Sequence, residues 1–429
     1  MVERPNGPGV FILRGRTANR NGWPRFLAPV NACGYAPGHQ MRTQLVATAW
    51  TAIIACAPAH DVPSGEPGTP VPGLRDVELG QFYAGLALFN KVYLPEEGLG
   101  PLFNENQCSA CHTVPAAGGT TGFERVVKAT RFQGPGACDA LSHEGGENIR
   151  SQATPLLRAR GVESEVIPAS ATEVGRFTPP FLFGLGLVEA VPDQAIVEGE
   201  DPRGTDGDGI SGRAARTPDG RLARFGRKAE FATVGEFIEG ALRLEMGLTS
   251  RPMDQERVNG KPLPPGTDPT AEPEVDQRTV ELLTAFVRFL APPAPATPRS
   301  QAHGDTVAAG KRLFQDLGCP GCHAPSMRTG PAEVAALRRK TVVLYSDLLL
   351  HDMGPALADV CGYAAAPAEL RTEMLTGLQH RERFLHDGRT ADLREAILAH
   401  GGEAQRARDA FARLPWLRQE YVLAFLRTL

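Results

Sequence analysis

Cys108-Ser109-Ala110-Cys111-His112 and Cys319-Pro320-Gly321-Cys322-His323 are two copies of one pattern, Cys-x-x-Cys-His. Thiols at this spacing can add to the two vinyl groups of one haem, and the histidine that follows then lies under the iron as proximal ligand. A single zinc site would need all four cysteines to converge, which a separation of about 200 residues does not favour. We therefore predict two covalently bound haems c, with the cysteines as attachment sites and His112 and His323 as iron ligands.

The composition narrows the class of protein. The chain has 429 residues, 42% of them hydrophobic, and a formal net charge of −4. This size allows two or three domains with full cores. Acids and bases are mixed along the chain, which gives no nucleic-acid-binding footprint. The 47 glycines and 37 prolines predict long loops around short helices.

The sequence around the two motifs repeats. Gly85–Phe89 and Gly310–Phe314 share the pattern Gly-x-x-Leu-Phe upstream of each motif, as in the N-terminal helix of cytochromes c. Residues 279–290 and 419–429 close the two halves with apolar residues three and four apart, which is typical of amphipathic helices. We therefore predict a mainly α fold of two tandem cytochrome c-like haem domains, the first enlarged by loop insertions, each bounded by a packed pair of terminal helices.

The pattern of the N-terminal region predicts an export signal. Residues 41–56 run from a Met and one basic residue through an apolar stretch that is too short to span a bilayer. The stretch ends in Cys56, as in the lipobox of bacterial lipoproteins; the alternative is a plain signal peptide cut near Ala55 or Ala57. We expect lipidation at Cys56 and a location on the periplasmic side of a bacterial membrane, held there through the lipid anchor only.

The predicted organisation of the whole chain follows from these features. It comprises a misassigned N-terminal extension (1–40), a signal peptide with lipobox (41–56), a flexible tether (57–75), the first haem domain (76–290), a Pro-rich linker (291–299) and the second haem domain (300–429).

The repeat also suggests the sixth ligand of each iron. Superimposing the halves sets Met246-Gly247 opposite His400-Gly401, and methionine and histidine both ligate haem iron. The alternative is that Met246 packs in a core and His400 caps a helix. Met353 and His351 are rival ligands for the second haem, and His143 is a rival for the first.

From about residue 78 to its end, the chain resembles the bacterial di-haem oxidoreductase family, a group of peroxidase-type proteins also labelled thiol oxidoreductases. The resemblance rests on four strings: residues 98–106 leading into Cys108, residues 206–213, residues 347–355, and residues 384–389 followed by 400–404. Kinship with di-haem cytochrome c peroxidases implies one haem that takes in electrons and one that meets peroxide. It also implies that His400 stands where those peroxidases carry the Met ligand of the electron-transfer haem.

Two departures from the peroxidases affect the function. They use a Trp between the haems, whereas the mature chain has only Trp416, in its last helix, and their pattern for a distal acid is missing. Glu189 is the acid we would test first as a catalytic group, with a structural role as the alternative. If Met246 and His400 both bind iron, peroxide has no open position.

The functional prediction therefore has two forms. The first is an exported di-haem oxidoreductase of peroxidase type, which receives electrons from a small redox protein (a cytochrome c or a cupredoxin) and acts on peroxide or another small oxidant. The alternative is a pure electron-transfer cytochrome with two six-coordinate haems and no catalytic site.

Two other features remain open at the sequence level. Asp206 and Asp208 offer hard oxygen ligands on a tight turn, so calcium competes there with a simple Asx/Gly turn; related peroxidases hold a calcium between their haem domains. Cys138 and Cys361 remain in the mature chain after the haem and lipobox cysteines, and an oxidising compartment favours a disulfide between them.

Overall fold

A computed structural model describes residues 62–123, 126–205, 207–251 and 255–429, all within one unit that spans Ala57–Leu429. The predictions for residues 1–40, for the signal peptide at 41–56, for Cys56 and for Asp206 concern residues outside the described ranges. No helix in the described ranges is long and apolar enough to cross a membrane.

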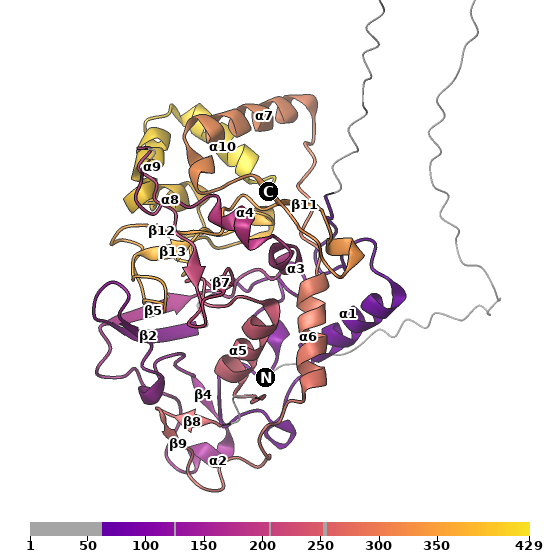
Figure 1. Cartoon of the computed structure of the whole chain (residues 1–429), viewed down its shortest axis with the longest axis vertical. Coiled ribbons are helices and arrows are strands. Elements are labelled where there is room, and N and C mark those ends of the chain that lie inside the picture. Colours follow the sequence, from indigo (N-terminus) through magenta and orange to yellow (C-terminus); the bar gives the residue numbers. More distant parts are fainter. Residues whose placement is uncertain (1–61, 124–125, 206, 252–254) are drawn as a thin grey trace, which may run out of the picture. The chain divides into compact units, whose positions relative to one another are not determined.

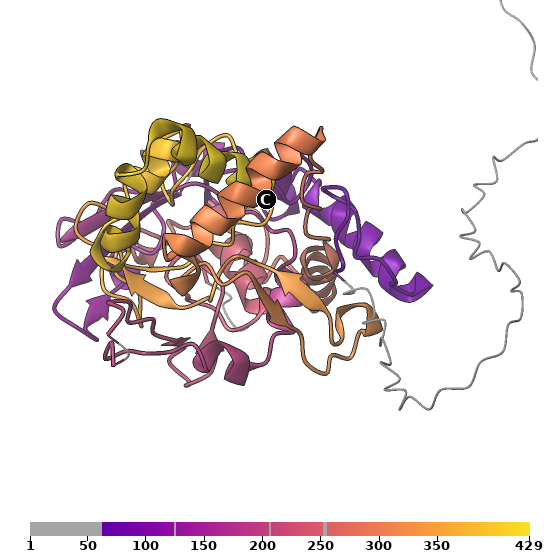
Figure 2. The same cartoon turned by 90° about the horizontal axis from the view of Figure 1, so that it is seen from above.

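Two pairs of packed helices frame the haem-attachment motifs. Helix α1 (Asp76–Phe89) packs on α6 (Gln277–Phe289), and α7 (Gln301–Asp316) packs on α10 (Trp416–Leu426) (Figure 1). The predicted pairing of terminal helices in each half is therefore confirmed, and Figure 2 shows the α7–α10 end of the molecule from above.

One glycine in each pair lets the backbones approach closely. A Cβ at Gly85 would lie 2.0 Å from the carbonyl oxygen of Leu282, and one at Gly310 would lie 1.8 Å from that of Tyr421. Both distances are far inside van der Waals contact, so only glycine fits at these positions. The repeated Gly-x-x-Leu-Phe pattern thus reflects the same close helix packing in both halves of the chain.

The prediction of a mainly α fold is wrong. Only 32% of the described residues are helical, and the strands form several small antiparallel sheets. The helical periodicity that supported the prediction covers only the terminal pairs. The Gly- and Pro-rich sequence between them forms short strands and loops instead. The largest sheet consists of β2 (Val126–Phe132) between β3 (Cys138–Asp139) and β5 (Glu173–Phe177).

The remaining elements are short. The other helices are α2 (Pro155–Arg158), α3 (Leu185–Glu189), α4 (Asp193–Val197), α5 (Val234–Met246), α8 (Leu393–Leu398) and α9 (Gln405–Ala412). The two-stranded sheets pair β1 (Leu102–Phe103) with β4 (Gln152–Ala153), β6 (Ala215–Arg216) with β7 (Leu222–Ala223), β8 (Arg257–Val258) with β9 (Lys261–Pro262), β10 (Ser326–Arg328) with β11 (Thr341–Val343), and β12 (Leu350–Asp352) with β13 (Glu369–Arg371).

The two halves of the sequence are interlocked. The larger hydrophobic core joins side chains of α1, α3, α5 and α6 to Leu344, Leu348 and Met374 from the second half, while a smaller core lies around α7 and α10. A disulfide between Cys138 and Cys361, with Cα atoms 5.8 Å apart, ties β3 to the segment after β12. The pairing that the sequence only favoured is therefore present.

Candidate haem sites

The two attachment motifs adopt the same local structure. Each begins in a short 3₁₀ turn, Cys108–Ala110 or Cys319–Gly321. The Nδ1 atom of His112 lies 3.0 Å from the carbonyl oxygen of Gly119, and that of His323 lies 2.8 Å from the carbonyl oxygen of Tyr345. A ring that donates from Nδ1 presents Nε2 as the metal ligand. Burial lowers the pKa of both imidazoles to about 4, so both are neutral, as ligation requires.

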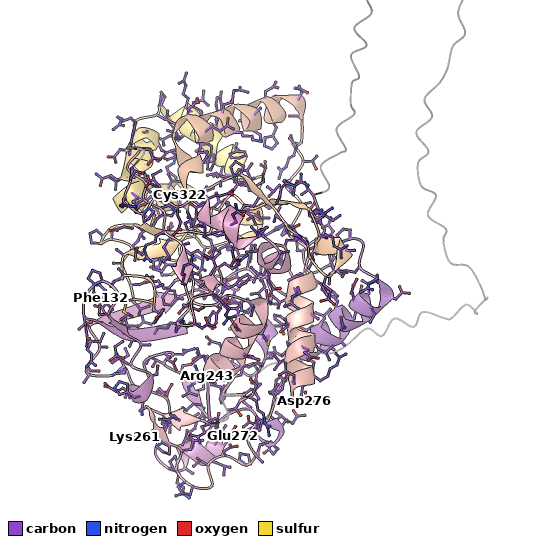
Figure 3. All side chains as sticks on the ribbon, viewed as in Figure 1. Phe132, Arg243, Lys261, Glu272, Asp276 and Cys322 are labelled. Carbon is purple, nitrogen blue, oxygen red and sulfur yellow. A yellow bond between two sulfur atoms is a disulfide. The ribbon has the colours of Figure 1, made fainter. Side chains whose placement is uncertain are left out.

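The second motif opens into a cavity of about 600 Å³ (Cys322 is labelled in Figure 3). Cys319, Cys322 and His323 line it together with His400 and apolar side chains such as Phe314 and Phe411. The volume lies within the ~300–1,000 Å³ typical of cofactor sites. Two thiols, a neutral imidazole and an apolar wall on one cavity are the donor set and surroundings that a covalently bound haem needs, so the residues fit this group.

His400 lies on the same cavity as His323. It follows α8 and lies 2.8 Å through Nδ1 from the carbonyl oxygen of Ala396, which again leaves Nε2 available. Its pKa is lowered, chiefly by burial, and it contributes after burial to lowering the pKa of His323, so the two rings are near each other. Met353 also lines the cavity, but among the residues that the structure describes no hydrogen bond fixes its thioether.

His351 has a different setting. Its Nε2 lies 2.8 Å from Asp347 Oδ2 and its Nδ1 lies 2.8 Å from Glu403 Oε2. Burial alone would lower the pKa of His351, but hydrogen bonds to Asp347, Cys322 and Glu403 raise it to about 12. Both nitrogens of this imidazolium are engaged, so in this arrangement neither offers a lone pair to iron.

The loop that contains Asp208 covers this end of the cavity. Ser211 donates from its backbone N–H and its hydroxyl to Glu403, at 3.0 and 2.5 Å, and Asp208 and Ile210 line the cavity. The Asp208 carboxylate accepts from the backbone N–H of Ile210, which forms an Asx turn. Since Asp206 is not described, calcium at this loop stays a prediction.

At the first motif, Met246 is the nearest candidate for a sixth ligand. It is buried at the last residue of α5, and its Sδ lies 4.0 Å from Cys108 Sγ. The donor types fit a haem c, but a macrocycle attached to Cys108 needs the thioether of Met246 to move away from that sulfur. His143, the rival ligand, is 65% exposed next to Glu144.

Glu189 has structural partners. Its carboxylate accepts from Arg288 at 2.5 and 3.1 Å and from the backbone N–H of Val234, at the start of α5, at 2.8 Å. These contacts fix α5 to α6 and match the alternative that we gave for this residue; its role as an acid stays a prediction. Trp416 is 67% exposed at the start of α10.

Sequence reasoning missed a cluster of arginines on the second cavity. Arg227, Arg371 and Arg381 line it together with Glu373, to which all three guanidinium groups point. Arg227 lies 146 positions before Glu373. No local pattern signals such a convergence, because the folding of the two halves onto each other produces it.

Comparison with known proteins supports the haem assignment. A family model described as "Di-haem oxidoreductase, putative peroxidase" matches residues 160–429. No curated protein matches the chain. Among solved structures, hydrazine synthase of Kuenenia stuttgartiensis has 13% identity over 90% of this chain and 100% of its own, with a TM-score of 0.40. A variant of the di-haem peroxidase BthA of Burkholderia thailandensis has 16% identity over 86% and 89%, with a TM-score of 0.37. At these scores the assignment rests on the family match.

Proposed function

The chain belongs to the di-haem oxidoreductase family, and we propose that it is an exported c-type cytochrome that carries two covalently attached haems and reduces peroxide or a similar small oxidant. The observation that carries this proposal is the pairing of His323 and His400 on one cavity beside Cys319 and Cys322. Haem, once bound, supplies reversible one-electron chemistry at iron.

The second site is suited to electron transfer. His323 and His400 would hold the iron from both faces, which leaves no position there for peroxide. The backbone carbonyls of Tyr345 and Ala396 fix both rings, and apolar side chains line much of the cavity. Rigid, saturated ligation keeps reorganisation small when an electron enters or leaves.

The first site is the place for the oxidant in this proposal. His112 is the proximal ligand, oriented by Gly119, and access to the other face depends on Met246. Electrons would come from a small redox protein, a cytochrome c or a cupredoxin, through the second site.

Location outside the cytoplasm is supported by one prediction and one observation. Haem attachment to Cys-x-x-Cys-His and the Cys138–Cys361 disulfide both belong to an oxidising, exported compartment. The apolar stretch that ends in Cys56 supplies the signal and the lipid anchor on the periplasmic side.

One observation favours a second function, that of an electron relay. The Met246 thioether already lies beside Cys108, where a short movement would bring it over the iron. If it stays bound in every redox state, both irons are six-coordinate and the protein passes electrons without chemistry of its own.

Optical and electron paramagnetic resonance spectra of the ferric and half-reduced holoprotein separate these functions. We expect His400→Ala to convert one low-spin haem to high-spin and Met246→Ala to change the other haem. Met353→Ala, in the same cavity as His400, is the matched control and should change neither. A first haem that opens on half-reduction and reacts with peroxide supports the peroxidase. Two haems that stay low-spin and inert to peroxide in every redox state support the relay.

A further inference from the structure

Three buried arginines surround a single carboxylate on the wall of the second cavity. Arg227 Nη1 lies 2.6 Å from Glu373 Oε2, Arg381 Nη2 lies 2.8 Å from Oε1, and Arg371 Nη2 lies 3.4 Å from Oε2. The three guanidinium-bearing side chains are only 12%, 9% and 7% exposed. Despite burial, Arg227, Arg381 and Arg371 hold the pKa of Glu373 well below its usual range, so its charge is present.

This arginine cluster (Arg227, Arg371 and Arg381) has two positive charges more than Glu373 can balance. Buried charges are costly unless they are paired, and removing compensation from a buried ion costs several kcal/mol by general experience. The other hydrogen bonds of the cluster go to neutral oxygens of Thr178, Gly226 and Thr372. The Nε atoms of Arg227 and Arg381 are buried without any partner. The cluster is therefore suited to anionic groups that the described residues do not provide.

No other acid on the cavity wall can supply the missing charge among the residues that the structure describes. Asp208 and Asp316 are exposed, and Glu403 is held by His351. Among the other basic groups, Arg406 is exposed and Arg408 pairs with Asp409. His351 lies between Asp347 and Glu403, two carboxylates against one imidazolium, and Asp347 also acts on Arg371. The excess of positive charge on this wall is thus concentrated in the arginine cluster.

We propose that the arginine cluster binds the two propionate carboxylates of the haem attached at Cys319 and Cys322. Haem carries two propionates on the edge opposite the vinyl groups that the cysteines would take, and two carboxylates match the excess charge of the cluster. Arginine is suited to this because its fork of donors engages carboxylates in pairs. The inference rests on the proposed haem attachment at the second motif and adds the residues that fix and tune this haem.

The cluster also connects the two sites. The guanidinium carbon of Arg381 lies 4.4 Å from the centre of the Phe181 ring. Phe181 follows Pro180, whose backbone lies near His112 of the first motif and contributes to the pKa of that imidazole. Propionates bound at the arginine cluster would therefore lie on the side of the second site that is next to the segment near the proximal ligand of the first.

Fixed positive charge at the propionates has a measurable consequence. It keeps them ionised and offsets their repulsion of an electron that enters the haem. We expect Arg381→Leu to favour the oxidised state about tenfold, which corresponds to a midpoint potential lower by about 59 mV for a one-electron couple. A propionate that has lost its partner should also titrate, so the potential should become pH-dependent between about pH 5 and 8.

The test is a redox titration of the holoprotein at several pH values, followed by electron paramagnetic resonance to resolve the two haems. Arg406→Leu is the matched control, because it removes the same charge from an exposed position on the same cavity and should change neither the potential nor its pH dependence. Glu373→Gln keeps all three arginines and should raise the potential. Arg381→Lys keeps the charge and should shift the equilibrium less than Arg381→Leu.

Three results would overturn the inference: a pH-independent, unshifted potential in Arg381→Leu, an equal shift in Arg406→Leu, or a lowered potential in Glu373→Gln. If Arg381→Leu does not fold, the direction of the shift in Glu373→Gln still decides, and an unshifted potential in Arg406→Leu is its control. Mass spectrometry of the wild type separates this outcome from failure of the proposed function, since a chain without haem at Cys319 and Cys322 would refute the haem site itself.

Discussion

Replacing Gly310 with alanine tests the close helix packing that supports the second haem site. Gly310 lies in α7, where an added Cβ would be 1.8 Å from the carbonyl oxygen of Tyr421 in α10. An ordinary contact requires the helices to separate by about 1.5 Å, since backbone at this point cannot yield as a flexible side chain would. Phe314, on the same helix, has its ring centre 6.5 Å from that of His323, so the separation would also disturb the haem pocket.

The expected magnitude follows from two opposed effects. Overpacking costs typically about 1–3 kcal/mol, and a clash with backbone belongs at the upper end. Alanine in place of glycine in a helix returns about 0.5–1 kcal/mol. We therefore expect Gly310→Ala to lower the free energy of unfolding by about 2 kcal/mol, and Gly85→Ala in α1, whose added Cβ would lie 2.0 Å from the carbonyl oxygen of Leu282, to do the same.

Two glycines in the same helices provide matched controls. The nearest atom to a Cβ at Gly304 in α7 is 3.7 Å away, and a Cβ at Gly80 in α1 meets nothing within 4 Å. Gly304→Ala and Gly80→Ala should therefore raise the free energy of unfolding by about 0.5–1 kcal/mol. Urea titration followed by far-ultraviolet circular dichroism measures all four variants. If Gly310→Ala and Gly304→Ala change stability by the same amount and sign, close backbone approach is not what the repeated glycine provides.

Three further predictions concern other parts of the molecule. Burial, followed by repulsion from Glu272, Glu274 and Asp268, raises the pKa of Glu256 to about 9 (Glu272 is labelled in Figure 3). The Glu256 carboxyl therefore keeps its proton in the folded state, whereas in the unfolded state it loses the proton near the ordinary pKa of a glutamate. The contribution of the protonated Glu256 to stability is full below about pH 4.5 and is lost as the pH rises toward 9. In urea titrations between pH 6 and 8.5, the free energy of unfolding of the wild type should therefore fall by up to about 1.4 kcal/mol per pH unit relative to Glu256→Gln. Equal pH slopes for the two proteins would show that the carboxyl is ionised in the folded state. The Cys138→Ser/Cys361→Ser double variant removes a cross-link that spans 223 residues, and its free energy of unfolding should be about 2–5 kcal/mol lower in the same assay. An unchanged free energy of unfolding under non-reducing conditions would mean that the disulfide does not constrain the unfolded chain. Glu189→Gln should lower the free energy of unfolding by about 1 kcal/mol, because the side chain loses its pairing with Arg288 and with the start of α5. The rate of reaction with peroxide should stay unchanged. A rate loss of about 100-fold at unchanged stability would instead identify Glu189 as the catalytic acid.

The parts of the fold that could be predicted from sequence are those where a local pattern has one physical meaning. Cys-x-x-Cys-His predicts haem attachment and adopts the same 3₁₀ turn in both copies, and Gly-x-x-Leu-Phe marks a close helix contact. The family resemblance, which rested on residues 98–106, 206–213, 347–355, and 384–389 followed by 400–404, is confirmed by the match over residues 160–429. Apart from β2 and β5, the strands were not predicted because each has only two or three residues, and neither alternation nor helical spacing develops over that length.

The arginine cluster shows a different limit. Arg227 lies just before α5, whereas Arg371, Glu373 and Arg381 lie beyond the second motif, and each alone is an ordinary charged residue in a polar stretch. The function of these arginines becomes visible only in the structure, where they are buried next to one another. An excess of positive charge costs little at the surface, but when buried it requires an anion as partner. Sequence periodicity reports which face of an element is apolar; it carries no information about charge balance between segments far apart.

The candidate sixth ligands were partly predictable from the sequence repeat and partly dependent on contacts that only the structure shows. The repeat places Met246 and His400 at the same point, just past or at the end of a helix and directly before glycine, and the structure keeps that equivalence. The surroundings differ, however: His400 is fixed by the carbonyl of Ala396 on an open cavity, whereas the Met246 thioether lies against Cys108 in the larger core. A fixed imidazole favours permanent ligation, and a flexible thioether that must move to admit the haem favours a bond that can open. The same duplicated helix end would thus give one saturated haem and one that can be opened, which is the division of labour that a di-haem peroxidase requires.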